Sequence, residues 1–388
     1  MIYLLVLLII ISFSLKYDFH GTFIIKAKKP YMFLCLCFIL LAGLRFYVGS
    51  DTHNYAYDFS VMPDLSKLSD FHRLESRYQF GWDAFVCIIK TCFDNFVFVQ
   101  LITAVIVNVA IFWFIKRNTT NVFLAVMFYY ILNYFEYNME IMREAIAVVL
   151  GLVAVVFYEK HRRFYFILLL MLAFEFHISA IILAIIPLIT KLKYSKKLVI
   201  ITISLSVIVP FLFTQVSGLA NLINLFTASD PEYLLHYLNQ SMDNSRNLLY
   251  YLDLYLSYLI IPIFCLLTLK ENYKYPGMVI AFIVMRCMGM FTYAFYRFGN
   301  YFEPFYWILL ADATYYFWKK ISIPKSILVT MITTCLLFIY QRWQLGKYPM
   351  YPEHKLYERY IPYEMVNSTD HNYSKSKSKF YFRNGTHD

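Results

Sequence analysis

Long apolar runs recur along the whole chain, and they constrain its fold more than any other feature of the sequence. A helix needs about 20 mainly apolar residues to cross a hydrocarbon layer of about 30 Å. We therefore expect an all-α polytopic membrane protein with about 10–12 transmembrane helices. The expected spans are 1–15, 30–44, 95–115, 121–138, 141–158, 198–214, 249–270, 277–296, 300–318 and 324–341.

Composition agrees with a chain that resides in a bilayer. Of its 388 residues, 60% are hydrophobic, 20% are aromatic and only 15% are charged, whereas about 25% are charged in typical soluble domains. The net charge of +10 is expected where Lys and Arg gather in cytoplasmic loops. The basic balance therefore reflects membrane topology, and we expect no nucleic-acid partner.

Basic residues at the ends of the spans predict their orientation, because short loops rich in Lys and Arg stay in the cytoplasm. These residues are Lys16, Lys26, Lys28, Lys29, Lys116, Arg117, Lys160, Arg162, Arg163, Lys319 and Lys320. Alternation of the spans then puts the regions 45–94, 139–140, 215–248 and 297–303 on the outer face.

The segment 164–190 does not fit simple alternation, since basic residues flank both of its ends. Arg163 precedes it and Lys191 follows it. Each half of the segment is about 13 residues long, or roughly 20 Å as a helix, which is short for a full crossing. We predict a broken or re-entrant helix pair near 164–190, with a polar apex around 175–179.

Eight charged or titratable side chains fall at or near outer ends of spans in this topology. They are Arg45, Asp51, Glu75, Arg143, Glu144, His177, Arg297 and Glu303. An ionisable group in or beside a transmembrane segment is costly, so a functional role is its default interpretation. Outer-edge Arg and Glu also form structural pairs, but eight of them on one face favour a shared site.

Single residues of this set keep two interpretations. Arg143 could form an ion pair with Glu140 or Glu144 at the start of a helix, or its guanidinium could bind an anion. His177 could be a satisfied core histidine in a kink, or it could act in catalysis or contact phosphate. Arg286 lies deeper in its span with no carboxylate nearby in the sequence, and we expect it to turn inward.

Several signatures are absent from the sequence. It contains no Gly-rich phosphate loop with Lys-Ser/Thr, no GxSxG, no HExxH and no Cys/His cluster with metal-ligand spacing. An ATPase, a serine hydrolase and a metalloprotease are therefore disfavoured, and we expect neither a metal nor a cofactor. The seven cysteines are odd in number and mostly embedded in apolar runs, so buried thiols are expected.

The chain is expected to form a single polytopic membrane domain over 1–341. From 342 to 388 the apolar runs are lost and the sequence becomes polar. A polar segment cannot bury enough apolar surface to order itself. We therefore predict a polar C-terminal tail that is largely disordered at its end.

An ordered set of short motifs carries a resemblance to a known family. The set is Gly43-Leu44-Arg45, Val48-Gly49-Ser50-Asp51-Thr52-His53-Asn54-Tyr55, Glu75 before Phe80-Gly81-Trp82, Met142-Arg143-Glu144-Ala145-Ile146-Ala147, Phe176-His177-Ile178-Ser179-Ala180, Arg297 before Tyr301-Phe302, and Ile361-Pro362-Tyr363. In order and spacing it resembles the EpsG family of Wzy-type polysaccharide polymerases over nearly the whole chain. Two departures are Glu144, where the family usually has Gln, and Glu75, which lies farther from the aromatic-Gly pair.

The resemblance implies a multi-pass enzyme of the bacterial inner membrane, with an active site that faces the periplasm or the cell exterior. Such an enzyme joins undecaprenyl-diphosphate-linked oligosaccharide repeat units into O-antigen, capsule or exopolysaccharide. It transfers the reducing end of the growing chain from its lipid carrier to a sugar hydroxyl of the next unit. A chain-length regulator and a flippase are further candidate partners.

Residue roles follow from that implied chemistry. Arginine grips phosphate oxygens through a planar pair of donors, and a general base near the acceptor hydroxyl contributes about 10²–10⁴-fold to the rate. The expected contacts to the diphosphate and the glycan are Arg143 and Arg297 as a clamp, Arg45 as a third arginine, and Glu144 and Tyr301. The candidate catalytic residues are Asp51, His177 and Glu75.

Other classes of membrane protein remain alternatives. A flippase or transporter of lipid-linked oligosaccharide would also use outward-facing arginines. A membrane glycosyltransferase with a polyprenyl-phosphate-sugar donor typically keeps an acidic pair in its first outer loop, whereas Asp51 here stands alone and Asp58 follows seven residues later. A membrane O-acyltransferase could use His177 but would leave the arginines unexplained.

Overall fold

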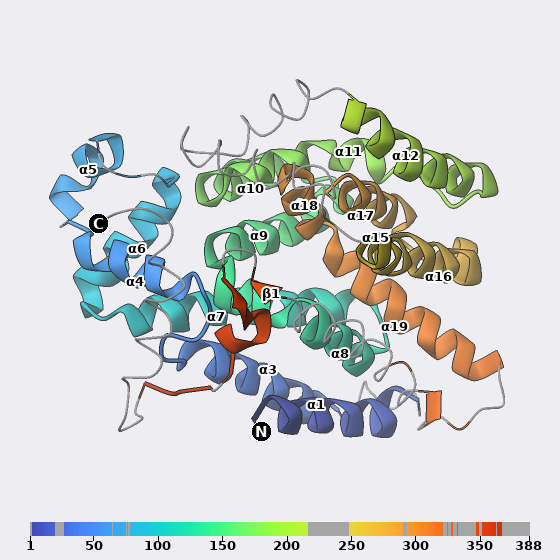
Figure 1. Cartoon of the computed structure of the whole chain (residues 1–388), viewed down its shortest axis with the longest axis horizontal. Coiled ribbons are helices and arrows are strands. Elements are labelled where there is room, and N and C mark those ends of the chain that lie inside the picture. Colours follow the sequence, from blue (N-terminus) through green and yellow to red (C-terminus); the bar gives the residue numbers. More distant parts are fainter. Residues whose placement is uncertain are drawn as a thin grey trace. The chain divides into compact units, whose positions relative to one another are not determined.

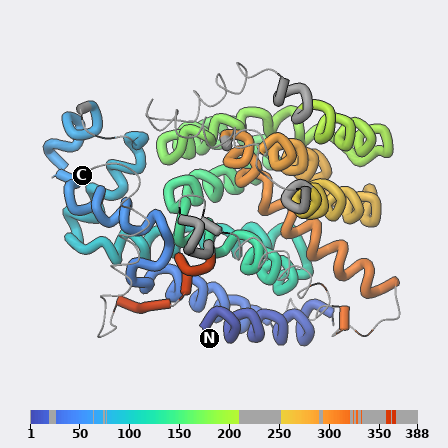
Figure 2. Tube along the Cα trace, viewed as in Figure 1, coloured from blue at the N-terminus to red at the C-terminus, as the bar shows by residue number. Residues whose placement is uncertain are grey.

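The structure is a computed structural model (Figure 1), and it describes residues 2–19, 27–63, 65–74, 76, 78–215, 248–289, 293–320, 351–361 and 363–366, with a few further positions between 324 and 348. Figure 2 draws the same trace with the other residues in grey. Within the described residues every regular element is helical, apart from one antiparallel hairpin of β1 (Lys347–Tyr348) and β2 (Tyr351–Lys355). The predicted all-α polytopic membrane fold is confirmed.

The chain divides into two compact units. The first contains Met1–Ser76, Phe80–Val149 and Trp318–Asp388, and the second contains Arg77–Gln79 and Leu150–Phe317. The C-terminal part of the chain thus belongs to the same unit as the N-terminus. The single domain over 1–341 and the tail over 342–388 stay predictions.

The helices of the first unit follow its apolar runs. They are α1 (Ile2–Phe13), α3 (Lys28–Gly43), α4 (Thr52–Val61), α5 (Leu68–Leu74), α6 (Phe80–Phe93), α7 (Phe96–Asn118), α8 (Val122–Leu132) and the start of α9 (Met142–Glu159), with π-helical turns at Ser14–Asp18 and Glu136–Glu140 and 3-10 turns at Leu65–Lys67 and Leu356–Arg359. α7 begins where the Asn95 side chain accepts a hydrogen bond from the N–H of Val97 (3.0 Å). It ends with Lys116 and Arg117, whose charge suits the negative end of the helix dipole.

A closed ring of polar side chains lies in the core of the first unit. Asn108 donates to Oδ1 of Asn138 (2.7 Å), Asn138 donates to the Tyr129 hydroxyl (2.7 Å), and Tyr129 donates to Oδ1 of Asn108 (3.0 Å). All three residues are buried. Because buried polar groups are costly unless they are hydrogen-bonded, this ring fixes α7, α8 and the following π-helical turn in one arrangement.

The second unit holds the remaining helices. They are the rest of α9, α10 (Arg163–Phe176), α11 (Ile186–Ile189), α12 (Lys196–Gln215), α15 (Leu248–Tyr255), α16 (Ile261–Leu269), α17 (Pro276–Met288), α18 (Tyr293–Asn300) and α19 (Glu303–Lys320) up to Phe317, with 3-10 helices at Ile178–Ile185 and Lys270–Asn272 and a π-helical turn at Leu256–Ile260. The π-helical turn joins α15 to α16 without a gap.

The broken helix pair predicted near 164–190 is confirmed. α10 ends at Phe176, and His177 has extended backbone angles (φ −156°, ψ 127°) before the 3-10 helix Ile178–Ile185 begins. The carbonyl of His177 accepts from the N–H of Ala180 (3.0 Å) and its own N–H donates to Ala173 (3.0 Å), so the break leaves both of these backbone groups satisfied.

Spans differ from their predicted bounds where the helices are interrupted. Among the described residues, Phe96–Asn118 and Leu252–Asn272 are long and apolar enough to cross a membrane, and Val122–Leu132, Ile178–Ile189 and Pro276–Met288 are shorter apolar helices. The predicted span 277–296 is divided, since α17 ends at Met288 and α18 begins at Tyr293. Gly289 follows α17, and a Cβ there would lie 2.8 Å from the Tyr296 backbone. The predicted span 324–341 falls almost entirely outside the described residues.

We predict that Gly49→Ala destabilises the protein. Gly49 has φ +101°, and a Cβ there would lie 2.4 Å from the carbonyl oxygen of Met139. A side chain in such a conformation costs about 1–3 kcal/mol, so the thermal unfolding midpoint of the purified protein in detergent should fall. Gly151→Ala is the matched control, since Gly151 does not have positive φ and the atoms nearest to its Cβ would belong to the Leu183 side chain, not to backbone. Equal midpoints for the two variants would contradict the prediction.

Candidate functional site

The loop between α3 and α4, residues 44–51, turns sharply. Tyr47 and Gly49 both have positive φ (51° and 101°), a conformation that glycine adopts readily because it lacks a Cβ. Thr52 then begins α4, and its hydroxyl donates to the carbonyl of Val48 (2.8 Å). The loop is therefore a defined structure that delivers Asp51 to the start of a helix.

Arg45 is fully buried and supports this loop from within. Its Nε donates to the carbonyl of Val48 (3.1 Å), its Nη1 donates to the carbonyl of Ala42 (2.5 Å), and its Nη2 contacts Sδ of Met142 (3.3 Å). Burial lowers the pKa of Arg45 to about 10, so the guanidinium stays charged at neutral pH. Ala42 lies in the last turn of α3, where a cation favours the helix dipole.

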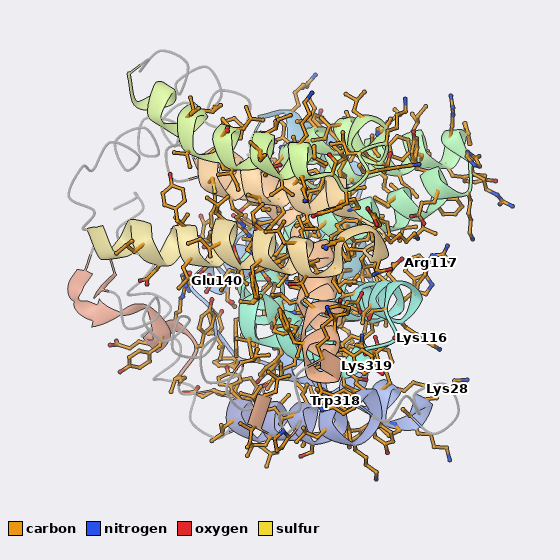
Figure 3. All side chains as sticks on the ribbon, turned by 90° about the vertical axis from the view of Figure 1, so that its right-hand side faces the viewer. Lys28, Lys116, Arg117, Glu140, Trp318 and Lys319 are labelled. Atoms are coloured by element: carbon orange, nitrogen blue, oxygen red, sulfur yellow. The ribbon has the colours of Figure 1, made fainter. Side chains whose placement is uncertain are left out.

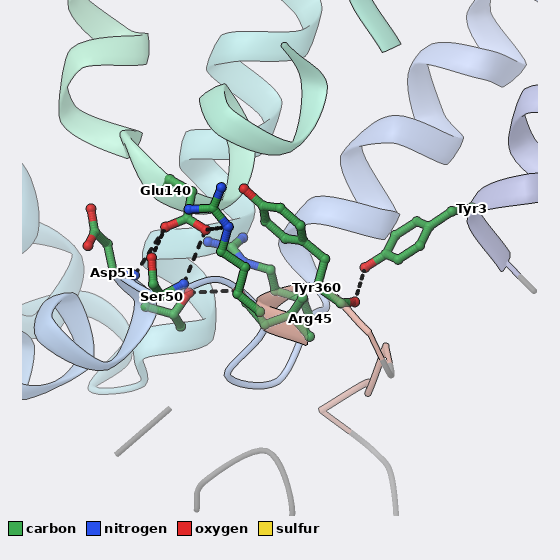
Figure 4. Close-up of polar contacts among 9 residues, drawn as sticks. Tyr3, Arg45, Ser50, Asp51, Glu140 and Tyr360 are labelled. Carbon is green, nitrogen blue, oxygen red and sulfur yellow. Dashed lines mark hydrogen bonds and ion pairs between the residues drawn. The ribbon is translucent and has the colours of Figure 1, made fainter. Parts of the chain in front are cut away.

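Glu140 receives several hydrogen bonds from the same loop (Figure 4). Its Oε1 accepts from the N–H of Ser50 (3.2 Å), and its Oε2 accepts from the hydroxyl of Ser50 and from the N–H of Asp51 (3.3 Å). Nε of Arg359 lies 3.7 Å from Oε1. Glu140 is only 6% exposed, and a buried carboxylate is tolerated when donors and an opposite charge converge on it.

The backbone N–H of Asp51 points toward Glu140, whereas its side chain points away from Glu140. The backbone N–H of Asp51 donates to Glu140, while Figure 4 shows the Asp51 carboxylate turned away from Glu140. That carboxylate does not cap α4, and the residue is half-buried. Glu140 therefore binds the backbone of Asp51 without taking up its carboxylate.

The remaining predicted residues of the first unit lie at the start of α9 or outside the described residues. Arg143 and Glu144 are in the first turn of α9. Arg143 is half-buried and Glu144 is 2% exposed. The nearby Glu140 forms its ion pair with Arg359. Glu75 lies outside the described residues.

In the second unit, Arg286 anchors α18 to α17. Its Nη1 donates to the carbonyl of Tyr296 (3.0 Å), and its Nη2 donates to Oδ1 of Asn300 (2.7 Å) and to Glu303. Its guanidinium carbon lies 4.1 Å from the centre of the Tyr296 ring. Gly299 makes room for it, because a Cβ there would lie 2.9 Å from Cδ of Arg286.

Arg286 therefore turns inward as predicted, and it has a carboxylate partner that the sequence did not reveal. Arg286 and Glu303 are 1% and 3% exposed, so the pair is desolvated and its geometry is constrained by further hydrogen bonds. The result is a rigid α18, the helix that carries Arg297.

Arg297 begins a chain of hydrogen bonds within the second unit. Its Nη1 lies 2.7 Å from Nε2 of His177. Nδ1 of His177 lies 2.5 Å from Oγ of Ser179, which lies 3.0 Å from the hydroxyl of Tyr301. His177, Ser179 and Tyr301 are all buried, whereas Arg297, the first member of this series of hydrogen bonds, is half-buried.

The chemistry of arginine fixes the direction of these bonds. A guanidinium has donors and no acceptor, so Nε2 of His177 accepts and the imidazole is neutral. The ring proton then lies on Nδ1 and is donated to Oγ of Ser179, because the other neighbour of Nδ1, the backbone N–H of Ser179 at 3.2 Å, is itself a donor. In this state His177 orients Arg297 and its Nε2 lone pair is engaged.

Sequence reasoning brought His177, Arg297 and Tyr301 to attention separately, and the structure brings these three together. It missed Glu140 as a ligand of the 44–51 loop, Ser179 as the link between His177 and Tyr301, and Arg359 as the partner of Glu140. The signal for Ser179 was its place beside His177 in the apex of the broken pair. No comparable local signal marked Arg359.

Neither a metal site nor a disulfide is found among the described residues. No group of three or more His, Cys, Asp or Glu side chains there is arranged to hold a metal ion. The described cysteines are Cys35, Cys37, Cys87, Cys92, Cys265 and Cys287, and each is a free thiol. The side chains around the 44–51 loop and around Arg297 therefore offer guanidinium, imidazole, hydroxyl and carboxylate groups to a ligand.

Comparison with protein families gives one match. The family model of the EpsG family matches residues 28–365, well over half of the chain. No curated protein and no solved structure matches the chain. The matched range includes the 44–51 loop, the start of α9, the broken helix pair and α18. The chain therefore belongs to the EpsG family, and this membership supports a polymerase-type role for it in polysaccharide biosynthesis.

Proposed function

We propose that the protein polymerises undecaprenyl-diphosphate-linked oligosaccharide units on the outer face of the bacterial inner membrane. The observation that carries this proposal is the oriented guanidinium of Arg297, which the buried side chains of His177, Ser179 and Tyr301 support. Family membership supplies the substrate class. A fixed guanidinium suits a diphosphate, because it offers two parallel donors and remains protonated.

The reaction proposed is a glycosyl transfer. The hydroxyl oxygen of the incoming unit attacks the anomeric carbon of the growing chain, and the bond from that carbon to the diphosphate oxygen breaks. The electron pair of that bond leaves with undecaprenyl diphosphate, and the hydroxyl proton passes to a base. Arg297 stabilises the negative charge that develops on the leaving group.

Asp51 is the favoured base among the three candidates. The Nε2 lone pair of His177 already accepts from Arg297, which makes His177 a positioning residue for that arginine. Glu75 lies outside the described residues. The hydrogen bonds of the 44–51 loop fix the backbone that carries the Asp51 carboxylate, and a general base must be held in position.

The other residues expected to contact the substrate have different roles in this proposal. Arg143 is a second diphosphate ligand. Glu144 and Tyr301 are each 2% exposed, so their contribution to glycan binding is indirect, and that of Tyr301 acts through Ser179 and His177. Arg45 supports the loop that carries Asp51, because its donors are directed to the carbonyls of Val48 and Ala42. A flippase that delivers the lipid-linked units and a chain-length regulator are the proposed protein partners.

An outward-facing site agrees with the distribution of charge in the first unit. Four basic residues, Lys28, Lys116, Arg117 and Lys319, lie toward one side of the view in Figure 3. Glu140 lies toward the other side. Contacts near these residues support their grouping: the hydroxyl of Tyr31 donates to the carbonyl of Phe112 (2.7 Å), and the rings of Phe19 and Trp318 are 4.9 Å apart. By the positive-inside rule, the basic end is cytoplasmic.

We predict that Arg297→Ala abolishes long glycan chains while single repeat units still reach the cell surface. The guanidinium would be lost from the leaving group, at a cost of about 10²–10³ in rate for an electrostatic contact of this kind. Arg297→Lys should rescue poorly, because an ammonium cannot reproduce the planar pair of donors. Glycan length and the amount of protein in the membrane are measured together, by gel electrophoresis and immunoblotting.

Two outcomes of that experiment would reject the proposal. Normal chain length at normal abundance in Arg297→Ala would remove Arg297 from the reaction. Complete absence of repeat units from the surface, in a strain that lacks the protein, would indicate a flippase. Arg73→Gln is the matched control, since Arg73 and its partner Asp70 are 74% and 75% exposed and such a pair contributes about 0–1 kcal/mol.

We predict that the apex of the broken helix pair faces the cell exterior. Glu175 is exposed whereas His177 is 3% exposed, so Glu175→Cys is the better reporter. In a variant without the seven native cysteines, a membrane-impermeant thiol reagent added to intact cells or spheroplasts should label position 175. Labelling that requires permeabilised membranes would put the apex in the cytoplasm, contrary to the prediction.

A further inference from the structure

A segment near the C-terminus lies along the 44–51 loop. This segment, residues 356–361 and 363–366, is called here the C-terminal strap. Three backbone hydrogen bonds join it to the end of α3 and to the loop, and they run from the N–H of Phe46 to the carbonyl of Glu364 (2.9 Å), from the N–H of Val366 to the carbonyl of Leu44 (3.0 Å) and from the N–H of Gly49 to the carbonyl of Arg359 (2.8 Å). The strap thus binds the backbone on both sides of Arg45 and Tyr47.

Tyrosine hydroxyls fasten the strap to two helices of the first unit. Tyr3 of α1 donates to the carbonyl of Tyr360 (3.0 Å), as Figure 4 shows. Tyr363 of the strap donates to the carbonyl of Leu41 in α3 (3.1 Å). The Tyr360 side chain packs 5.2 Å from the ring of Phe135 and is buried. The strap is therefore a packed element of this unit.

Glu140 is the point where the strap and the loop meet. Its carboxylate accepts from Ser50 and from the backbone of Asp51, and it also faces Arg359 of the strap. At 3.7 Å the contact with Arg359 is longer than a hydrogen bond, so it acts through charge. The Glu140 side chain is 8% exposed and that of Arg359 is 22% exposed, which limits screening by water.

We propose that Glu140 and the C-terminal strap position Asp51 for catalysis. Glu140 draws the N–H groups of residues 50 and 51 to one side, which leaves the Asp51 carboxylate on the other. The strap holds the backbone of residues 44–49, which precede Asp51. Its Arg359 offsets the negative charge of Glu140. Glu140 and Arg359 are thus positioning residues, and this inference rests on the proposed role of Asp51 as the base. The family match extends to residue 365 and so includes nearly all of the strap.

The test uses the full-length protein in detergent with lipid-linked repeat units, and it follows both the loop and the reaction. Glu140→Gln should release the loop, because the amide NH2 of Gln donates and would face the N–H groups of Ser50 and Asp51, which also donate. Hydrogen exchange in peptides that cover 44–52 should accelerate. The kcat per folded protein should fall on the order of 10- to 100-fold, as expected for a displaced catalytic group, while KM stays unchanged because Glu140 does not touch substrate.

Two variants of Arg359 test whether its charge is what matters. Arg359→Lys should retain kcat, since a charge at 3.7 Å needs no directional donor, whereas Arg359→Gln should lower it. A chain that ends after Lys355 loses the strap, and one that ends after Asn367 keeps it, so only the former should show faster exchange in 44–52. Arg73→Gln again serves as the control.

Two results would overturn the inference. Unchanged exchange in 44–52 for both Glu140→Gln and the chain ending after Lys355 would show that the strap does not hold the loop. A normal kcat for Glu140→Gln, in a protein that Asp51→Asn inactivates, would show that Glu140 does not position Asp51. Full activity of Asp51→Asn would instead reject the proposed base, and exchange in 44–52 would still report whether the strap holds the loop.

Discussion

A backbone amide or carbonyl inside a hydrocarbon layer must find its partner within the protein, and the rest of this structure depends on that constraint. Helices meet it along the spans. Where a helix is interrupted, other groups substitute: at His177 the backbone bonds Ala173 and Ala180, and at Asn133 the N–H bonds Tyr129 while the carbonyl accepts from Tyr137. Such interruptions gather polar groups at a few positions, and His177 with its partners occupies one of them.

Both units bury charge, and they stabilise it by the same means. In the first unit Glu140 collects donors from Ser50 and Asp51 and the charge of Arg359. In the second unit Arg286 bonds to Glu303, to Asn300 and to a backbone carbonyl. Removal of one member leaves an uncompensated buried charge, which is more destabilising than loss of the pair as a whole. Effects within either cluster should therefore be strongly non-additive.

The extent of prediction from sequence differs between helices and contacts. The broken pair near His177 could be predicted because its arm lengths and flanking basic residues are local features. The partner of Arg286 could not, since Glu303 belongs to α19 and approaches Arg286 only because α18 packs on α17. Likewise, nothing in the local sequence links Glu140 to Arg359. Helices depend on composition within one stretch, whereas these pairs depend on how distant stretches pack.

The polar tail illustrates the same limit. Its composition predicted disorder only toward its end, and it gave no signal for the contacts of residues 356–361 and 363–366, which are three backbone bonds and two bonds from tyrosine hydroxyls. Arg359 and Glu364 belong to this polar stretch, and their carbonyls accept from the N–H groups of Gly49 and Phe46 in the 44–51 loop. A segment that is too polar to form a core of its own can still complete the hydrogen bonding of another.

The 44–51 loop leaves the ribosome about 300 residues before the strap that holds it. Its bonds to Arg359, Glu364 and Val366 cannot form until synthesis has passed residue 366. Closing so long a stretch of chain is slow compared with the formation of local helices. The local helices therefore form first, and the loop that carries Asp51 takes its final shape only after the strap has been synthesised.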